Sequence, residues 1–125
     1  MNIRNVTFSL FIVIVITLIA MSSSTHTRQS KTKARLDLVE RVIADCRKQK
    51  GDAIGKTECL YEYGKENGIP EKNRLSWAID GYGNLPVVEQ SSSCKLTAFC
   101  AAYSKGKNGV DECGKGDDIT LKSCP

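Results

Sequence analysis

The chain has 125 residues, with 18 lysines and arginines against 14 aspartates and glutamates, and a net charge of +4. The surplus lies near the N-terminus, because residues 36–125 contain 13 basic and 14 acidic side chains. A nearly neutral domain lacks the clustered lysines and arginines of a nucleic-acid-binding face, so we expect no nucleic-acid partner.

The first 22 residues have the three parts of a secretory signal peptide. Arg4 provides a positive start, residues 8–20 form an uncharged apolar run, and the small residues Ala20 and Ser22 precede the expected cut. A membrane-spanning helix needs roughly 20 apolar residues, and this run has 13. We therefore expect residues 1–22 to be a signal peptide of a secreted, extracellular protein without stable membrane insertion. The alternative is an uncleaved signal anchor.

Residues 23–35 are polar, lack apolar periodicity and contain four basic side chains but no acid. Such a segment cannot bury enough apolar surface to fold, so we expect a disordered basic arm. One alternative is a short propeptide removed at Lys33 or Arg35, and another is an arm that contacts an acidic surface. Residues 36–125 are expected to form a single disulfide-stabilised domain.

All six cysteines follow the expected cut, and an even number in a short exported chain is typical of a disulfide framework. Their spacing contains no CxxC pair, and the one histidine, His26, is far from all of them, which argues against a zinc site. Each disulfide adds roughly 2–4 kcal/mol, which is comparable to the net stability of so small a core. The sequence predicts three disulfides, in a pairing that stays open, among Cys46, Cys59, Cys94, Cys100, Cys113 and Cys124.

Apolar periodicity predicts three helices in the first half of this domain. The clearest covers residues 36–50, where apolar side chains recur at spacings of three and four and Gly51 is placed to end the helix. A second helix is expected to begin near residue 52 or 57 and to end at residue 67, and a third, short one lies within residues 70–79. Each of them presents an apolar side to a common core.

The second half of the domain combines a loop, a helix and an irregular tail. Glycines and Pro86 predict a loop over residues 81–93, and apolar spacing predicts a fourth helix from Ser93 to about Ser104. Residues 105–125 are rich in glycine and are expected to be irregular, with a short extended piece near Ile119. The expected fold class is therefore small, disulfide-rich and mainly α, with about four short helices and an irregular C-terminal segment.

The side chains used by common catalytic mechanisms are missing from the expected fold. Proton transfer most often needs histidine, and His26 lies in the arm. Oxidised cysteines cannot act as nucleophiles. We therefore expect no enzyme activity, no cofactor and no metal. Four carboxylates flank Cys113, and we interpret them as a solvated acidic turn rather than a weak calcium site or a carboxylate enzyme: Asp111, Glu112, Asp117 and Asp118.

Four side chains are candidate contacts with a partner. Tyr82 stands between two glycines, where burial is difficult, and an exposed aromatic side chain is a frequent interface anchor. Trp77 is a second candidate, although large aromatic residues are more often part of a core. Lys105 and Lys107 belong to a glycine-rich basic loop that lacks the sequence of a phosphate-binding loop.

Export, dense disulfides and the missing catalytic histidine favour a non-enzymatic protein that binds an extracellular protein or receptor. Secreted scaffolds of this size include toxins, salivary or host-directed effectors, inhibitors and signals, which is an analogy at the level of the fold. The alternative is an extracellular carrier of a small apolar ligand, because several helices and three disulfides resemble insect odorant-binding proteins in general style. In that family the second and third cysteines are three residues apart, whereas 34 residues separate Cys59 from Cys94 here.

Overall fold

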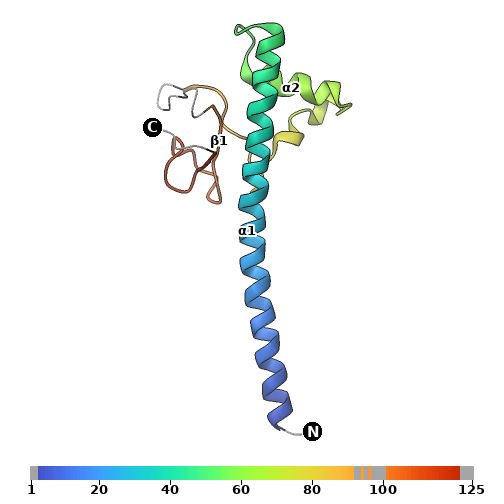
Figure 1. Cartoon of the computed structure of the whole chain (residues 1–125), viewed down its shortest axis with the longest axis vertical. Helices are drawn as coiled ribbons and strands as arrows, with labels where there is room; N and C mark the ends of the chain where they lie inside the picture. The colour runs from blue at the N-terminus through green and yellow to red at the C-terminus, as the bar shows by residue number, and fades with distance from the viewer. Residues whose placement is uncertain (1–2, 92–93, 95, 97–100, 122–125) are drawn as a thin grey trace.

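The computed structural model describes residues 3–91, 94, 96 and 101–121 (Figure 1). Both α2 and the C-terminal segment pack against the C-terminal half of α1, while the N-terminal half of α1 extends away from them (Figure 1). The described chain is a small, mainly helical fold, as expected. Its elements in chain order are α1 (Ile3–Lys50), α2 (Lys56–Glu66), the 3-10 turns η1 (Glu71–Asn73) and η2 (Ser76–Ala78), and the strands β1 (Tyr103–Ser104) and β2 (Ile119–Thr120).

The expected helix over residues 36–50 is confirmed as the C-terminal part of α1. Leu36, Val39 and Ile43 are buried, and they belong to the same apolar core as the buried side chains of α2. Gly51 ends the helix with φ = +89°, a conformation that side chains disfavour, and its N–H donates to Arg47 O over 2.8 Å. The apolar stripe seen in the sequence is thus the inner face of the fold.

Residues 23–35, for which the sequence predicted a disordered arm, are part of helix α1. The reason is a tertiary contact between segments far apart in the sequence. The hydroxyl of Thr32, which is fully buried, accepts a hydrogen bond from Gly81 N over 3.0 Å and donates one to Arg28 O over 2.8 Å. Gly81 fits because it lacks a side chain, since a Cβ there would lie within 3.0 Å of Arg28 Cα. Packing therefore begins near residue 28 rather than at residue 36.

The expected leader forms the outer part of α1. Residues 9–16 are exposed, and they include apolar side chains from Leu10 to Ile16. Within the described residues, no helix combines the length and the apolar character needed to cross a membrane. Cleavage after Ser22 stays a prediction.

The second expected helix is confirmed as α2, where Cys59 and Leu60 are buried in the core. The third expected helix is replaced by two separate turns, η1 and η2. Between them the backbone at Arg74 lies so close to Gly64 that a side chain on this glycine would collide with the Arg74 carbonyl. Trp77 Nε1 donates to Leu60 O over 3.0 Å, which holds η2 against α2. These two tertiary contacts keep the backbone from continuing as one regular helix.

The fourth expected helix is wrong at its C-terminal end, and residues 93, 95 and 97–100 of it lie outside the described part of the chain. Tyr103 and Ser104 form β1, which pairs antiparallel with β2, and both side chains are buried. On its other side, Tyr103 exchanges two backbone hydrogen bonds with Val87, at 2.8 and 3.2 Å. Backbone pairing on both sides therefore overrides the helical spacing. The extended piece expected near Ile119 is confirmed as β2.

Two disulfides join the described cysteines, with Cα–Cα distances of 5.8 Å for Cys46–Cys59 and 5.1 Å for Cys94–Cys113. The first connects α1 to α2, and the second connects the segment after the 81–91 loop to the C-terminal loops. Cys100 and Cys124 lie outside the described residues. The expected framework is thus confirmed for four of the six cysteines.

Candidate protein-binding surface

Asp80 is a buried carboxylate, 4% exposed, at the start of the loop that contains Tyr82. Its Oδ1 accepts hydrogen bonds from Tyr82 N over 2.8 Å and Asn84 N over 3.0 Å, which fold residues 80–84 into a tight turn. Its Oδ2 accepts from the hydroxyl of Ser104 on β1. A buried carboxylate is costly unless its oxygens are hydrogen-bonded, so these bonds fix the turn to β1.

A second set of bonds attaches the glycine-rich basic loop to the same turn. Asn84 Nδ2 donates to Gly106 O over 2.8 Å, and Gly106 N donates to Ser104 Oγ over 3.0 Å. Gly106 has φ = +67°, and a Cβ on it would collide with the Asp117 carbonyl. The structure therefore brings the loops of Tyr82 and Lys107 side by side, although the sequence separates them by more than 20 residues. We call residues 81–85 and 105–110 together the two-loop surface.

The two-loop surface presents aromatic, apolar and basic side chains. Tyr82 and Lys105 are partly exposed and Lys107 is exposed. Two large apolar side chains that the sequence analysis did not single out are also exposed, Leu85 at 46% and Val110 at 56%. Aromatic side chains such as Tyr82 are enriched where proteins bind proteins, whereas lysines are depleted there.

Trp77 does not belong to this surface. It is half-buried, its ring centroid lies 4.5 Å from that of Tyr63, and its indole N–H is bonded to Leu60 O. The ring therefore helps to pack η2 against α2, in agreement with the more common role of an aromatic residue in a core.

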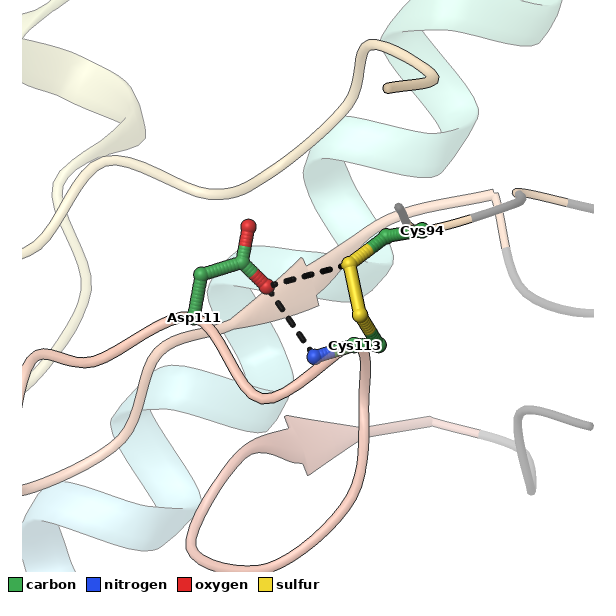
Figure 2. Close-up of side chains that lie close together, drawn as sticks. All are labelled: Cys94, Asp111 and Cys113. Carbon is green, nitrogen blue, oxygen red and sulfur yellow. Dashed lines mark hydrogen bonds between the residues drawn. A yellow bond between two sulfur atoms is a disulfide. The ribbon is translucent and has the colours of Figure 1, made fainter. Parts of the chain in front are cut away.

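Next to the two-loop surface, Asp111 connects the Cys94–Cys113 disulfide to β1. Its Oδ1 accepts a hydrogen bond from the hydroxyl of Tyr103 over 2.6 Å. The same oxygen accepts from Cys113 N over 3.0 Å and lies 3.8 Å from Cys94 Sγ (Figure 2). The bond from Tyr103 lowers the pKa of the Asp111 carboxyl. Burial and the nearby Asp111 carboxylate together raise the pKa of the Tyr103 hydroxyl, which therefore stays protonated.

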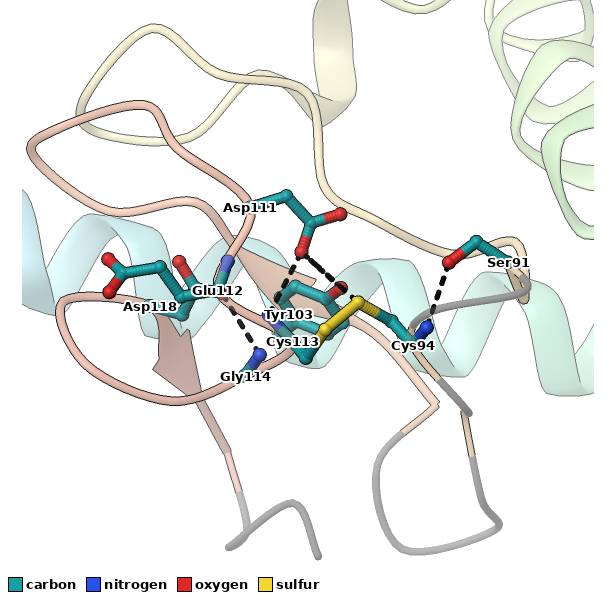
Figure 3. Close-up of a disulfide and its surroundings, with 8 residues drawn as sticks. All are labelled: Ser91, Cys94, Tyr103, Asp111, Glu112, Cys113, Gly114 and Asp118. Atoms are coloured by element: carbon teal, nitrogen blue, oxygen red, sulfur yellow. Dashed lines mark hydrogen bonds between the residues drawn. A yellow bond between two sulfur atoms is a disulfide. The ribbon is translucent and has the colours of Figure 1, made fainter.

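Asp118 organises the loop that follows the disulfide. Its Oδ2 accepts from Glu112 N over 2.8 Å and from Gly114 N over 2.9 Å, as Figure 3 shows for the loop around Cys113. Burial raises the pKa of the Asp118 carboxyl, and the charges of Asp111 and Glu112 add to this effect. The acidic turn expected from the sequence is therefore a loop whose carboxylates bond to its own backbone.

These bonds bear on the calcium and zinc alternatives. Within the described chain, the close group of three metal-ligating residue types is Cys94, Asp111 and Cys113, whose ligand atoms lie within 4.8 Å of one another. The two sulfurs are joined in a disulfide, so they offer no thiolate to a metal. One oxygen each of Asp111 and Asp118 accepts backbone N–H groups, while Asp118 Oδ1 is buried without a hydrogen-bond partner among the described residues.

A groove of about 210 Å³ lies beside the Cys46–Cys59 disulfide, between α1 and α2. Its lining combines the apolar Val42 and Tyr63 with charged side chains. Sites for small apolar ligands usually enclose roughly 300–1,000 Å³ with mostly apolar walls. This groove is smaller and more polar than such a site, so it does not favour the carrier alternative.

The sequence analysis missed Asp80, Asn84 and Ser104, the residues that join the two loops. An aspartate two residues before a loop residue often bonds to that residue's N–H, and Asp80 followed by two glycines in Gly81-Tyr82-Gly83 has this pattern. The contribution of Ser104 depends on a contact across 24 residues and leaves no local pattern.

Comparisons of the chain with protein-family models, with curated proteins and with solved structures gave no match. Its function is therefore inferred from the geometry of its own side chains.

Proposed function

We propose that this protein is exported, lacks enzyme activity and binds an extracellular protein through the two-loop surface. The observation that carries the proposal is the buried Asp80 carboxylate, which fixes the Tyr82 turn to β1 and thereby to the basic loop. Loops that are already fixed before binding lose little conformational entropy in a complex, and this raises affinity for a given contact area. A toxin, effector, inhibitor or signal would use such a surface.

The side chains on the two-loop surface support a protein as the partner. Tyr82 combines a large contact area with few rotatable bonds, and Lys107 adds a charge that can select a complementary surface. Leu85 and Val110 expose apolar area beside them, 46% and 56% respectively. Two exposed apolar side chains beside a tyrosine are favourable when an interface buries them.

Export is supported by the disulfides and by the leader. Disulfides are compatible with an extracellular protein, since the reducing cytosol keeps most thiols unpaired. Residues 1–22 have the order of charge, apolar run and small residues that a signal peptide needs.

The proposal that the protein is not an enzyme depends on the available acids and bases. His26 is the one histidine of the chain, and it is exposed on α1, two residues before Arg28. Tyr103 is held protonated by burial and by Asp111, so it is unsuited to act as a base near neutral pH. The charged groups around the loops therefore serve structure and recognition.

The test begins with expression of the whole chain in a eukaryotic secretory system, followed by binding of the secreted protein to an array of extracellular receptor domains. We expect one such domain to bind, and we expect Tyr82→Ala or Val110→Ser to weaken this binding at least tenfold. Lys72→Ala is the matched control, because Lys72 is exposed on η1, outside the two loops.

Two outcomes contradict the proposal. The first is retention of the protein inside the cell with its leader intact. The second is a bound receptor domain whose affinity is unchanged by Tyr82→Ala, Val110→Ser and Lys107→Ala together, because the contact would then lie elsewhere on the molecule.

A further inference from the structure

We infer that a turn of α1 forms a cationic flank of the two-loop surface, and that the protein partner offers an acidic face to it. The residues of this cationic flank are Arg28, Lys31 and Arg35. The inference rests on the proposed function, because it describes the charge of the partner that the two-loop surface would bind. It also goes beyond that function by assigning a role to a segment in which the sequence predicted disorder.

The three basic side chains of the flank lie together on α1. They are spaced by three and four residues, so they lie on one side of α1 as direct neighbours. Arg28 and Lys31 are exposed and Arg35 is partly exposed. The nearest acid along the helix, Asp37, pairs with Arg41 over 2.9 Å.

This turn of α1 contacts the Tyr82 loop. Thr32, which these three residues border on the helix surface, accepts the hydrogen bond from Gly81 N. The close approach of Gly81 to the Arg28 backbone puts Tyr82, the next residue, beside the basic turn. The cationic flank and the two-loop surface are therefore adjacent. The bond from Gly81 to Thr32 and the bond between Asp80 and Ser104 hold the Tyr82 loop against both α1 and β1.

The carboxylates near the two loops form hydrogen bonds within the fold. Asp80 is buried and bonded to the turn and to Ser104. Asp117 Oδ2 accepts from Asn108 N over 2.7 Å, and Glu112 Oε1 accepts from Asn108 Nδ2 over 2.9 Å. These hydrogen-bonded carboxylates keep their negative charge, and Asp111 beside them is exposed. Arg28 and Lys31 are exposed, so the positive charge is concentrated on the α1 flank rather than on the loops. An acidic surface is the complement of this charge pattern.

An acidic protein fits better than a sulfated glycan or an anionic membrane. Tyr82, Leu85 and Val110 lie within the same surface and need apolar contacts that a glycan does not provide. The positive charge is also limited to a few side chains on a nearly neutral domain, which is less than a polyanion usually selects.

The inference requires that residues 28–35 remain in the secreted protein. A cut at Lys33 or Arg35 would remove the fully buried Thr32 and its bond to Gly81. We expect the N-terminus of the secreted protein, read by sequencing and intact mass, to precede Arg28. An N-terminus at residue 34 or 36 overturns the inference.

The binding test uses the secreted full chain and a synthetic peptide rich in aspartate and glutamate with interspersed leucines. Its binding is followed through the amide NMR signals of residues 28–35, 81–84 and 106–109. We expect shifts in all three segments, and an affinity that falls about tenfold in the triple variant R28Q/K31Q/R35Q and also falls as salt is raised. Glutamine preserves helix propensity, so the variant should fold.

The control is K48Q/K65Q/K72Q, which removes the same charge from three exposed lysines elsewhere. No peptide binding, or equal binding by the two triple variants, overturns the inference. Tighter binding of a heparin oligosaccharide or of phosphatidylserine vesicles at the same residues replaces the acidic protein by another partner class and overturns it as well. The peptide test does not use Tyr82→Ala or the receptor array. A failure of the acidic-partner inference can therefore be distinguished from a failure of the proposed function.

Discussion

The hydroxyl of Tyr103 donates to Asp111 from a ring that is 1% exposed, and this bond connects β1 to the loop closed by Cys94–Cys113. We predict that Tyr103→Phe lowers the free energy of unfolding by about 1–2 kcal/mol, because it removes one hydrogen bond to a charged acceptor. Urea unfolding at pH 7 measures the loss. Tyr63→Phe is the control, since the Tyr63 hydroxyl is not part of this network.

The same pair has a defined pH dependence. The bond from Tyr103 lowers the pKa of Asp111 in the folded state below its ordinary value of 3.8. The contribution of this hydrogen bond to the free energy of unfolding is therefore present above about pH 4. It is lost as the pH falls through the lowered pKa of Asp111. The difference in the free energy of unfolding between the wild type and Tyr103→Phe should become smaller below that pH. A difference that stays constant down to pH 2 would mean that the acceptor is not the carboxylate.

Asp118 shows the opposite shift, because burial and the neighbouring carboxylates raise its pKa. A raised pKa of an acid means that ionisation opposes folding, and this penalty grows as the pH rises through the folded-state pKa. We predict that Asp118→Asn, which keeps an acceptor for Glu112 N and Gly114 N, unfolds at a higher urea concentration than the wild type at pH 7.

The advantage of Asp118→Asn should vanish below about pH 3.8, the ordinary pKa of an aspartate, where both proteins are neutral at this position. Asp118→Ala separates charge from hydrogen bonding, because it leaves two backbone donors without their acceptor and should cost about 1–3 kcal/mol. If Asp118→Asn is as unstable as Asp118→Ala, the buried charge is not the destabilising feature.

At the scale of elements, α1 and α2 are held together by apolar packing and by the Cys46–Cys59 disulfide. The disulfide closes a loop with a sequence separation of 13, for which restriction of the unfolded chain is worth roughly 3 kcal/mol. We predict that the double variant C46A/C59A remains folded at low temperature but loses about this free energy. Thermal unfolding by circular dichroism measures the change, and a loss below about 1 kcal/mol would contradict the prediction.

The contact between α1 and the Tyr82 loop depends on Gly81. A Cβ at this position would lie within 3.0 Å of Arg28 Cα, so we predict that Gly81→Ala costs about 1–3 kcal/mol through overpacking. Gly55→Ala is the matched control, since its Cβ would meet the nearest atom at 3.9 Å. If both variants have the same stability, the helical turn around Thr32 is not packed against this loop.

The limits of sequence-based prediction are clear from three elements. The helix ending at Gly51 could be predicted because its apolar stripe and its terminal glycine are local. The helix expected at Tyr103 was wrong because its spacing fits a helix while its backbone pairs with Val87 and Thr120. The helix over residues 23–35 could not be predicted, because a single buried Thr32 stands where a packed helix normally has an apolar face.

Part of the candidate site could be predicted from the sequence, and part of it could not. The glycines around Tyr82 and Lys107 predict that both lie in loops, where Tyr82 is partly exposed and Lys107 is exposed. Their adjacency could not be found, because it depends on bonds from Asp80 and Asn84 to partners more than 20 residues away. Exposed side chains leave a local pattern in the sequence, and the relative position of two loops does not.

At the scale of the whole molecule, two disulfides lie at different ends of the packed region, one beside α2 and one in the C-terminal loops. In an exported chain we expect every cysteine to be oxidised. We predict that the secreted protein keeps the pairs Cys46–Cys59 and Cys94–Cys113. Proteolysis without reduction, followed by mass spectrometry, should find the peptides of each pair linked. A different pairing of these four cysteines contradicts the prediction.

The hydrogen bonds of Asp80 fix the backbone of the two loops without using the side chains that point outward. Asp80, Asn84 and Ser104 fix the backbone from the inside, whereas the proposed contacts with a partner are made by side chains such as Tyr82 and Lys107. Substitutions on the outside can therefore accumulate without moving the loops, so a lineage of such chains could change target while its architecture stays constant. For the same reason, randomising the outward positions of this small scaffold would give a display library whose members share one backbone.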